Sequence, residues 1–442
     1  MSTREPNRHL ERLYQQTGWT LRQFVQAVNR IGTERGTPLK YREPSAHQWR
    51  RGHLPKETAR PLILEALARK LGRPVTHAEA GFPAPAGSSH ATPSAVEGLI
   101  DLGRGDMDPS RRSVLGIGLF SVALTVPNWP DVVGRMESVQ AGGTPRIGMP
   151  EVDMVIAMTE RISELDDQFG GRHARPMAAA FLVNTVAPYL RADAPESVRK
   201  AMMSAASDLC YLTGYMAVDE GAHSLAQQYY LKALELAGAA EDYLTYCTTL
   251  RGMSVQAVDL GHGREAQRLA DAAAAASPQA GPRMRAFLAG QQAHAYAQIG
   301  ESNNALMYLR EAEVAMDRAE SRGKAFGSYD PAALNYHISQ VRYELGDLPG
   351  SIKAMQESDK VRYGVYRRAR VRHRAALAER QLEVGHLEAA CATWSLALDD
   401  YPLVQSGRVD QRMQKMLKLI RPHLKNHAAR ELHERARLVV PS

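Results

Sequence analysis

Cysteine is scarce in this sequence of 442 residues, and its three copies lie far apart. Cys210, Cys247 and Cys391 form no CxxC pair, and no pair of histidines lies near any of them. A disulfide framework or a zinc site needs such local spacing. We therefore expect neither a disulfide framework nor a bound metal or other cofactor. Free cysteines suit a reducing compartment, which predicts a cytoplasmic protein.

Long hydrophobic runs are almost absent. The only long uncharged apolar run, 114–126, falls well short of the roughly 20 residues that a membrane-spanning helix needs. The first residues contain no apolar region of a signal peptide. We therefore expect no membrane partner. The run follows Arg111 and Arg112, as in a twin-arginine export signal, but that signal must be N-terminal. The alternative is a buried element or a subunit interface.

Known catalytic motifs are lacking as well. The sequence contains no GxSxG, Walker loop, HExxH or complete Rossmann glycine set. Asp166 and Asp167 could in principle hold a metal ion. Adjacent residues on a helix point apart, however, so we expect a solvated helix cap there. The sequence predicts a protein that is not an enzyme.

Excess charge is confined to one end of the chain. Residues 1–83 hold 15 Lys and Arg against 7 Asp and Glu, whereas the remainder holds 40 against 41. The formal net charge of +7 therefore arises entirely in about the first fifth of the molecule. Such asymmetry is typical of a nucleic-acid-facing module joined to a nearly neutral body.

Residues 8–82 carry the signals of several short helices. Thr20 and Gln23 have the spacing of a capping box, in which each side chain bonds the other residue's amide. A loop of about 15 residues then separates this helix from a short basic one, where Ser45 and Gln48 repeat the capping-box spacing. Four or five short helices with a basic one in third place are the plan of a helix-turn-helix DNA-binding domain.

The rest of the chain divides by composition. Residues 83–150 begin and end in Pro/Gly-rich stretches, which predicts a linker with the short apolar segment 114–126 inside it. Residues 151–410 are rich in Ala, Leu, Arg, Glu and Gln, which favours helices throughout. Residues 411–442 form helices without the repeat described next, which predicts a pair of C-terminal capping helices.

A unit of two helices recurs through residues 151–410. Counted from a glycine in each turn, the fifth residue is small, the ninth is mostly large and the twelfth is small. Small residues let two antiparallel helices approach closely, and the large residue fills the remaining gap. The repeat glycines are Gly221, Gly261, Gly300, Gly346 and Gly385.

This order of residues resembles the second helix of the tetratricopeptide repeat (TPR). The glycines lie 39 to 46 residues apart, which exceeds the ~34 residues of a TPR unit, and HEAT-like repeats share the longer period. Both repeats build an α-solenoid with a concave groove. The predicted fold class is all-α, with a small helix-turn-helix domain and a TPR-like α-solenoid.

Three motifs near the N-terminus have the spacing of a known family. They are Thr20-x-x-x-Phe-Val, Ser45-x-x-x-Trp-x-x-Gly-x-x-Pro55 and Glu65-Ala-Leu-Ala-x-x-Leu-Gly72. Together they resemble the XRE, or lambda-repressor-like, family over about 65 residues. The long connection between the two motif helices departs from the tight turn of that family.

Further segments resemble a group of bacterial regulators that join an XRE domain to a TPR array. The segments are 162–171, 215–221 and 226–237. That group is implicated in developmental and antibiotic-production control, and its architecture is similar to that of RRNPP-type peptide-sensing regulators. The resemblance implies a double-stranded DNA operator, a peptide or small-molecule effector and a homodimer.

The candidate DNA-binding residues lie on or beside the short basic helix and at the preceding capping box. Basic side chains neutralise phosphates, and polar ones read base edges in the major groove. Trp49 and Ala46 are expected in the core. Arg50 and Arg51 could instead be solvated helix ends, which the helix dipole favours. The candidates are Thr20, Gln23, Tyr41, Arg42, Ser45, His47, Gln48, Arg50 and Arg51.

The candidate ligand-binding residues lie on the first helix of each repeat, which lines the groove of TPR-like arrays. Aromatic and amide side chains there suit a peptide backbone or a small apolar signal. Tyrosines at helical spacing also occur in packing between repeats, so we expect only about a third of these residues to touch a ligand. The candidates are Tyr211, Tyr215, Arg251, His294, Tyr336, Gln340 and Tyr343.

A basic run at 360–374 contains seven Lys and Arg and no acid. It could bind phosphates or an anionic ligand. It could equally be a helix face whose charge is neutralised by acids elsewhere in the body, and the sequence leaves both alternatives open.

The sequence as a whole predicts a DNA-binding transcriptional regulator whose TPR-like domain dimerises and senses a peptide or small-molecule signal. The alternative is a TPR protein-interaction scaffold whose helix-turn-helix domain does not bind DNA specifically.

Overall fold

The computed structural model of the chain is all-α over the residues that it describes. Beside the helices, these residues contain an isolated β-bridge between Arg146 and Asp193. No helix among them is long and apolar enough to cross a membrane. The apolar segment 114–126, and its predicted role as an interface, lies outside them. The described residues are 6–34, 39–71, 75, 79–83, 95–107, 146–276, 280–319 and 329–440.

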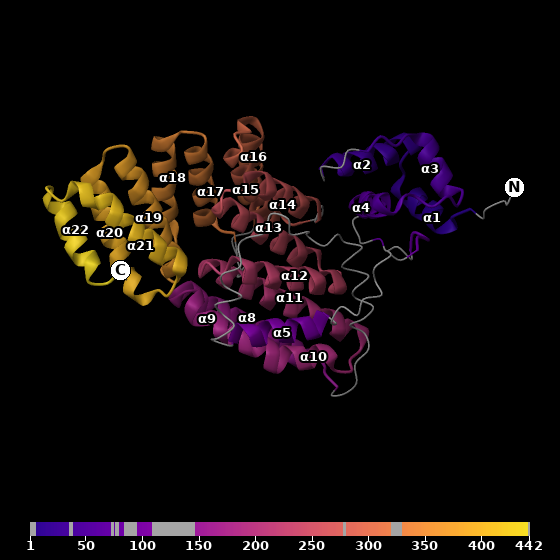
Figure 1. Cartoon of the computed structure of the whole chain (residues 1–442), viewed down its shortest axis with the longest axis horizontal. Helices are drawn as coiled ribbons and strands as arrows, with labels where there is room; N and C mark the ends of the chain where they lie inside the picture. The colour runs from indigo at the N-terminus through magenta and orange to yellow at the C-terminus, as the bar shows by residue number, and fades with distance from the viewer. Residues whose placement is uncertain are drawn as a thin grey trace.

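The N-terminal domain, drawn in indigo in Figure 1, has a cluster of aromatic rings in its core. The ring of Phe24 lies 6.2 Å from those of Trp19 and Trp49, edge-on to the latter. Trp49 and Ala46 are buried, as the sequence predicted. The elements of this domain are α1 (Arg8–Thr17), α2 (Leu21–Glu34), α3 (Glu43–Arg50), the 3-10 turn η1 (Glu57–Ala59) and α4 (Arg60–Leu71).

The predicted capping box at the start of α2 is confirmed. The backbone N–H of Thr20 donates to Gln23 Oε1 at 2.9 Å, and the N–H of Gln23 donates to Thr20 Oγ1 at 3.3 Å. Two groups that a helix N-terminus leaves without partners are thereby satisfied.

The second predicted capping box, at Ser45 and Gln48, is wrong. Helix α3 begins at Glu43, so Ser45 already lies inside its first turn. Pro44 favours this earlier start, because proline lacks the N–H that would have no partner there and its φ angle suits the helix. The connection between the two motif helices is also shorter than predicted, since only residues 35–42 separate α2 from α3.

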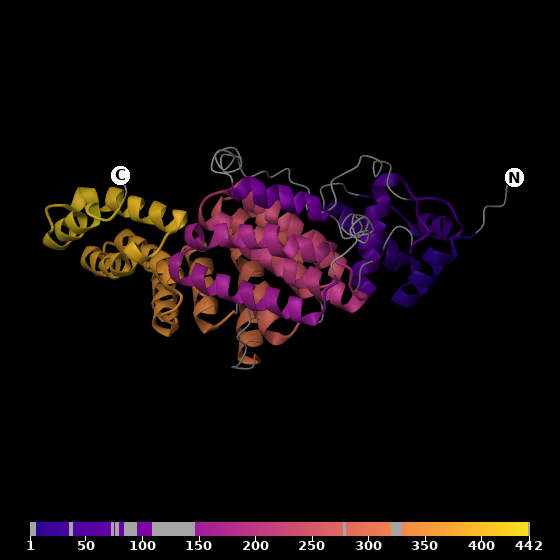
Figure 2. The same ribbon diagram turned by 90° about the horizontal axis from the view of Figure 1, so that it is seen from below.

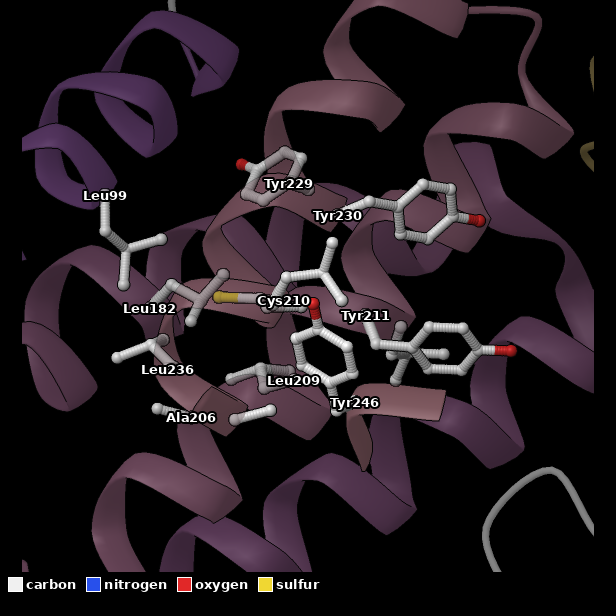
Figure 3. Packing of buried hydrophobic residues seen from close by; sticks show 14 of the residues in the cluster. Leu99, Leu182, Ala206, Leu209, Cys210, Tyr211, Tyr229, Tyr230, Leu236 and Tyr246 are labelled. Carbon is white, nitrogen blue, oxygen red and sulfur yellow. The ribbon is translucent and has the colours of Figure 1, made fainter. Parts of the chain in front are cut away.

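Helix α5 (Ala95–Met107) lies within the region predicted as a linker, yet it forms part of the core of the repeats. Leu99 is fully buried in the same cluster as Leu182 and Leu236 (Figure 3). A Cβ atom on Gly103 would collide with Val183, so glycine allows this helix to approach closely. Glycine-rich composition alone does not distinguish such packing from a linker.

Three helices and a π-helical turn precede the repeats. Helix α9 contains Pro176 and continues through the π-helical residues into α10. In the view from below, α5 and these helices, in violet and magenta, lie nearest the viewer in the middle of the molecule, and the yellow C-terminal helices extend to the left (Figure 2). Their bounds are α8 (Met149–Phe169), α9 (Gly171–Phe181), η2 (Leu182–Val186) and α10 (Ala187–Arg191).

The remaining described helices form antiparallel pairs, which makes this region a TPR-like array of paired-helix repeats. A last pair, α21 (Gly407–Ile420) and α22 (His427–Arg437), follows the five repeat pairs and begins slightly before the predicted capping helices. The five pairs are α11 (Glu196–Asp219) with α12 (His223–Ala240), α13 (Tyr243–Asp259) with α14 (Gly263–Ala276), α15 (Pro282–Gln298) with α16 (Ser302–Asp317), α17 (Pro331–Glu344) with α18 (Leu348–Val361), and α19 (Arg367–Glu383) with α20 (Leu387–Asp400).

Each repeat pair turns at one of the five predicted glycines. All five have φ angles between 78° and 84°, a conformation that favours glycine. At Gly221, the N–H of Ala222 also donates back to Ala217 O, which completes a Schellman turn. The predicted small residues are fully buried in every pair, which confirms the close helix approach. They are Ala226, Ala233, Ala266, Ala273, Ala305, Ala312, Ser351, Ser358, Ala390 and Ala397.

The array curls so that α19 and α21 come to lie beside α8 and α9 (Figure 1). Arg368 on α19 donates to Asp166 at 2.8 Å and Asp167 at 3.3 Å on α8, and to Asp219 on α11 at 3.4 Å. Arg408 on α21 lies 3.6 Å from Asp219. We call these five residues the clasp. The expectation of a solvated cap at Asp166 and Asp167 is wrong, because Asp166 is buried and ion-paired.

Burial shapes the protonation of the clasp. Burial raises the pKa of Asp166 to about 7, against the opposing effect of Arg368, and the neighbouring Asp219 and Asp167 raise it further. The pKa of Asp219 is lowered instead, because Arg368 and Arg408 together outweigh its burial. The clasp therefore holds one carboxyl that gains a proton near neutral pH and one that stays ionised.

Replacement of Arg368 by methionine should strongly destabilise the protein. Three carboxylates would lose their shared partner in a buried site, and breaking such a pair costs about 3 to 5 kcal/mol. The free energy of unfolding of the full chain in urea measures this effect. Arg161→Met removes an exposed arginine that pairs with Glu164, and should change stability by less than about 0.5 kcal/mol. Equal effects of the two changes would contradict the role of the clasp.

Replacement of Asp166 by asparagine should stabilise the protein increasingly as the pH rises. The folded-state pKa of about 7 exceeds the value of ~3.9 for an unfolded aspartate. The stabilisation from bound proton is therefore complete below pH ~4 and is lost as the pH rises through 7. We expect the Tm of Asp166→Asn minus that of the wild type to grow by a few degrees between pH 5 and pH 8.

The exposed Asp153 on the same helix provides the control for this measurement. Asp153→Asn should give a difference in Tm that does not change with pH. A constant difference for Asp166→Asn as well would show that Asp166 does not titrate in this range.

Candidate functional site

The short helix α3 presents one polar face to solvent. His47, Gln48 and Arg51 are exposed, whereas Trp49 faces the core. Positions 47, 48 and 51 have the spacing of neighbours on one side of a helix. Arg42, at the N-cap of α3, is exposed beside them. These four predicted DNA-binding residues are therefore accessible together.

A first cleft of about 680 Å³ lies between the starts of α2 and α3. Leu21, Val25 and Tyr41 give the cleft apolar surface, and two arginines, Arg22 and Arg42, also line it. The residues that line it are Leu21, Arg22, Val25, Gln26, Tyr41, Arg42, Glu43, Pro44 and His47.

A second cleft of about 380 Å³ lies between α1 and α3, on the other side of His47. The two clefts together are lined by six arginines and two glutamates, so the surface around α3 carries a positive field. The residues that line the second cleft are Pro6, Arg8, Glu11, Arg12, Gln15, His47, Arg50 and Arg51.

Two of the predicted DNA-binding residues have structural contacts. Arg50 forms a two-pronged ion pair with Glu11, and its guanidinium carbon lies 4.4 Å from the centre of the Tyr14 ring. The hydrogen bond from Arg50 lowers the pKa of Glu11. The ring of Tyr41 packs edge-on against Trp49 at 5.0 Å. Both residues hold α3 in position, while each also lines a cleft.

The other three predicted DNA-binding residues lie at the starts of the motif helices. Thr20 and Gln23 are exposed but bond each other in the capping box. Ser45 is half-buried in the first turn of α3. These residues adjoin the exposed face of α3 without belonging to it.

In the first repeats, the predicted ligand-binding residues form a packed layer. The ring of Tyr211 stacks at 6.0 Å on that of Tyr230 (Figure 3), and burial raises the pKa of Tyr211 to about 12. Tyr215 lies beneath the clasp, with Arg368 at 5.2 Å from its ring. Arg251 lies 3.9 Å from the centre of the Phe287 ring. Much of this surface therefore serves packing between repeats.

In the later repeats, the predicted ligand-binding residues lie close to arginines. Burial, reinforced by nearby arginines that include Arg380, lowers the pKa of His294 to about 4. Tyr336 stacks on a histidine of α19, Gln340 accepts a hydrogen bond from Arg380, and Tyr343 is exposed. The seven residues lie on the first helices α11, α13, α15 and α17, as the repeat frame predicted.

Sequence reasoning missed three arginines of the two clefts, Arg8, Arg12 and Arg22. The charge excess of the N-terminal module indicated that such residues exist. It did not indicate which of them face α3, because that depends on how α1 packs across the domain. Among the described residues, no group of His, Cys, Asp and Glu could hold a metal ion.

The fold defines an all-helical protein that joins a small N-terminal helical domain to a TPR-like array of paired helices. Residues 10–83 match a family described as the SP15 N-terminal domain. The match spans nearly the range predicted for the XRE-like module, but the description is not that of the XRE family. The relation to XRE regulators therefore stays a prediction.

Comparison with solved structures finds a chain of the crystal structure of the APC/C hetero-tetramer Cut9–Hcn1. The sequences are 13% identical, the alignment covers 86% of this chain, and the TM-score is 0.34. The present chain spans about 63% of the length of that chain. No curated protein sequence matches this chain.

Proposed function

We propose that the protein is a DNA-binding transcriptional regulator that contacts DNA through the exposed face of α3. The observation that carries the proposal is the accessible set of His47, Gln48 and Arg51 between two arginine-lined clefts. Gln48 has the side chain that pairs with the N6 and N7 atoms of adenine, and Arg51 has the one that pairs with guanine or phosphate. A helix with these groups on its open face fits the major groove of B-DNA.

The charge distribution supports the same role. Arginines of α1 and α2 flank α3 on both sides, where the two phosphate backbones of a major groove would lie. Arg50 and Glu11 fix the position of α3 against α1, so the polar face is held rigidly. Rigid placement lowers the entropy cost of binding.

The array supplies the second half of the proposed function, as a dimerising and ligand-binding body. A homodimer would place two α3 helices on half-sites about 34 Å apart, or a multiple of it, along the DNA. A peptide or small molecule bound in the concave groove would then favour one spacing of the two domains. The predicted cytoplasmic location is consistent with this role.

The second candidate function is a protein-interaction scaffold that does not bind DNA specifically. Exposed apolar side chains on α16 favour it, since Leu306, Met307 and Val314 are 40–50% exposed on one helix. Large exposed apolar side chains in one place often mark a protein interface. The two candidates differ in their affinity for DNA rather than in their fold.

Loss of the polar face of α3 should abolish operator binding. Gln48→Ala and Arg51→Ala should each weaken it by about 1 to 3 kcal/mol, and together remove it, while helicity stays unchanged. A gel-shift titration on a bound genomic site and a circular dichroism spectrum measure the two effects. Lys70→Ala removes the same charge from α4, outside both clefts, and should leave affinity nearly unchanged. Undiminished operator affinity in the double variant would refute the proposal.

The salt dependence of DNA affinity should distinguish the two candidates. A regulator should keep a specific operator complex at ~200 mM salt, because base contacts add to the phosphate contacts. A scaffold with a merely basic surface should bind all sequences weakly and lose them by that concentration. Genome-wide mapping of sites bound by the purified protein supplies the operator, and a single motif with regular half-site spacing supports the regulator.

A further inference from the structure

The structure separates the basic run at 360–374 into paired and unpaired residues. Arg367, Arg370 and Arg374 share Asp400 on the next helix. Arg374 also pairs with an aspartate of α18, Lys360 lies 3.9 Å from a glutamate, and the fourth arginine is part of the clasp. Acids of the same body therefore neutralise these five residues, which is one of the two alternatives that the sequence left open.

Two arginines of the run have no carboxylate partner among the described residues. Arg362, at the end of α18, donates to Ser358 Oγ at 3.0 Å and to the backbone carbonyl of Ala332 at 3.3 Å. Its Nε atom is buried without an acceptor. Arg372 has its guanidinium carbon 5.6 Å from the centre of the Tyr336 ring. Neither guanidinium therefore forms a direct ion pair with a carboxylate among the described residues, although Asp330 and Asp359 act on Arg362 through space.

A third arginine adds to this excess. Arg380 lies on α19 eight residues after Arg372, and only 5% of its surface is exposed. Its hydrogen-bond partners are neutral: the hydroxyls of Ser339 and Ser351 and the side-chain oxygen of Gln340. Burial lowers the pKa of Arg380. The ordinary pKa of arginine is so high that the guanidinium nevertheless stays charged. A buried guanidinium without a carboxylate partner is costly unless an anion approaches it.

The side chain of His373 has a hydrogen-bond donor, and no free acceptor, available to a ligand. Arg372 Nη2 lies 3.3 Å from His373 Nε2, and a guanidinium can only donate, so that ring nitrogen accepts. Because burial and the surrounding arginines lower the pKa of His373, the ring is neutral and its single proton lies on Nδ1. His373 is 5% exposed, and Nδ1 has no partner. A buried N–H is thus without an acceptor.

The same residues lie close together around one ring pair. Tyr336 stacks on His373 with the ring centres 4.2 Å apart and the planes 12° from parallel. Arg362, Arg372 and Arg380 are the charges that most affect His373. Two unsatisfied N–H donors and three cations therefore surround a flat aromatic pair. An oxyanion would satisfy the N–H donors, because its oxygens accept several hydrogen bonds, and its negative charge would offset the charge of the arginines.

We propose that the place where α17, α18 and α19 meet binds the phosphate or carboxylate group of a small molecule at Arg362, Arg372, His373 and Tyr336. This inference rests on the part of the proposed function that gives the array a small-molecule ligand, and it names the chemistry of that ligand. The oxyanion accepts from the two arginines and from His373 Nδ1–H. The ring of Tyr336 packs against the remainder of the ligand.

The test uses the full chain without DNA, with sodium pyrophosphate and sodium citrate as probes in isothermal titration calorimetry. Sodium chloride at the same ionic strength serves as the reference. We expect the wild type to bind at least one probe, and the one that binds distinguishes phosphate from carboxylate. Arg372→Gln and Arg362→Gln should each weaken binding by about tenfold or more. Glutamine at 372 can still donate to His373, so the fold is retained.

Arg370→Gln is the matched control, since Arg370 lies on the same helix and is already paired with Asp400. It should change the affinity by less than about twofold. No binding of either probe by the wild type, or equal binding by Arg372→Gln and the wild type, would overturn the inference. Because DNA is absent, failure here leaves the DNA-binding proposal to be judged by the gel-shift titration alone.

Discussion

Close approach of paired helices is the constraint on which the rest of the array depends. At two positions of every repeat pair the contact is made by alanine or serine with no exposed surface. A larger side chain there would force the helices apart and change the angle at which the next pair adds. Because the angles of successive pairs accumulate, small residues at these ten positions determine the curvature of the whole array.

The curvature brings charges together that are remote in the sequence. Arg368 and Asp166 are separated by 202 positions and still form a buried ion pair. The clasp also contains Asp167, Asp219 and Arg408, so two arginines serve three carboxylates, of which Asp166 and Asp219 are buried and Asp167 is partly exposed. One of the carboxyls has its pKa raised to about 7 as a result.

The two ends of the molecule use arginine in different ways. Around α3, exposed arginines line open clefts, where their charge acts through solvent over a distance of about a Debye length. Inside the array, Arg372 lies against rings instead, 5.6 Å from the centre of the Tyr336 ring and 3.3 Å from His373 Nε2. The first arrangement suits a polyanion that is neutralised at many points. The second suits a single anionic group bound in one place.

Much of the fold followed from local patterns, since the repeat glycines, the small residues and the capping box at Thr20 each involve neighbours in sequence or along one helix. The exposed face of α3 was predicted in the same way, although its starting residue was not. The role of α5 was missed, because glycines that allow close packing have the same composition as a linker.

The sequence by itself thus indicated where the paired helices of the array turn and which of their faces are buried, because turn conformation and helical spacing are local properties. Only the tertiary structure decided which arginines are neutralised. Arg368, Arg370 and Arg372 alternate along α19, yet one reaches the clasp, one reaches Asp400 and one faces Tyr336. The difference depends on which helix lies opposite each side chain, and that is set by the accumulated curvature of the array.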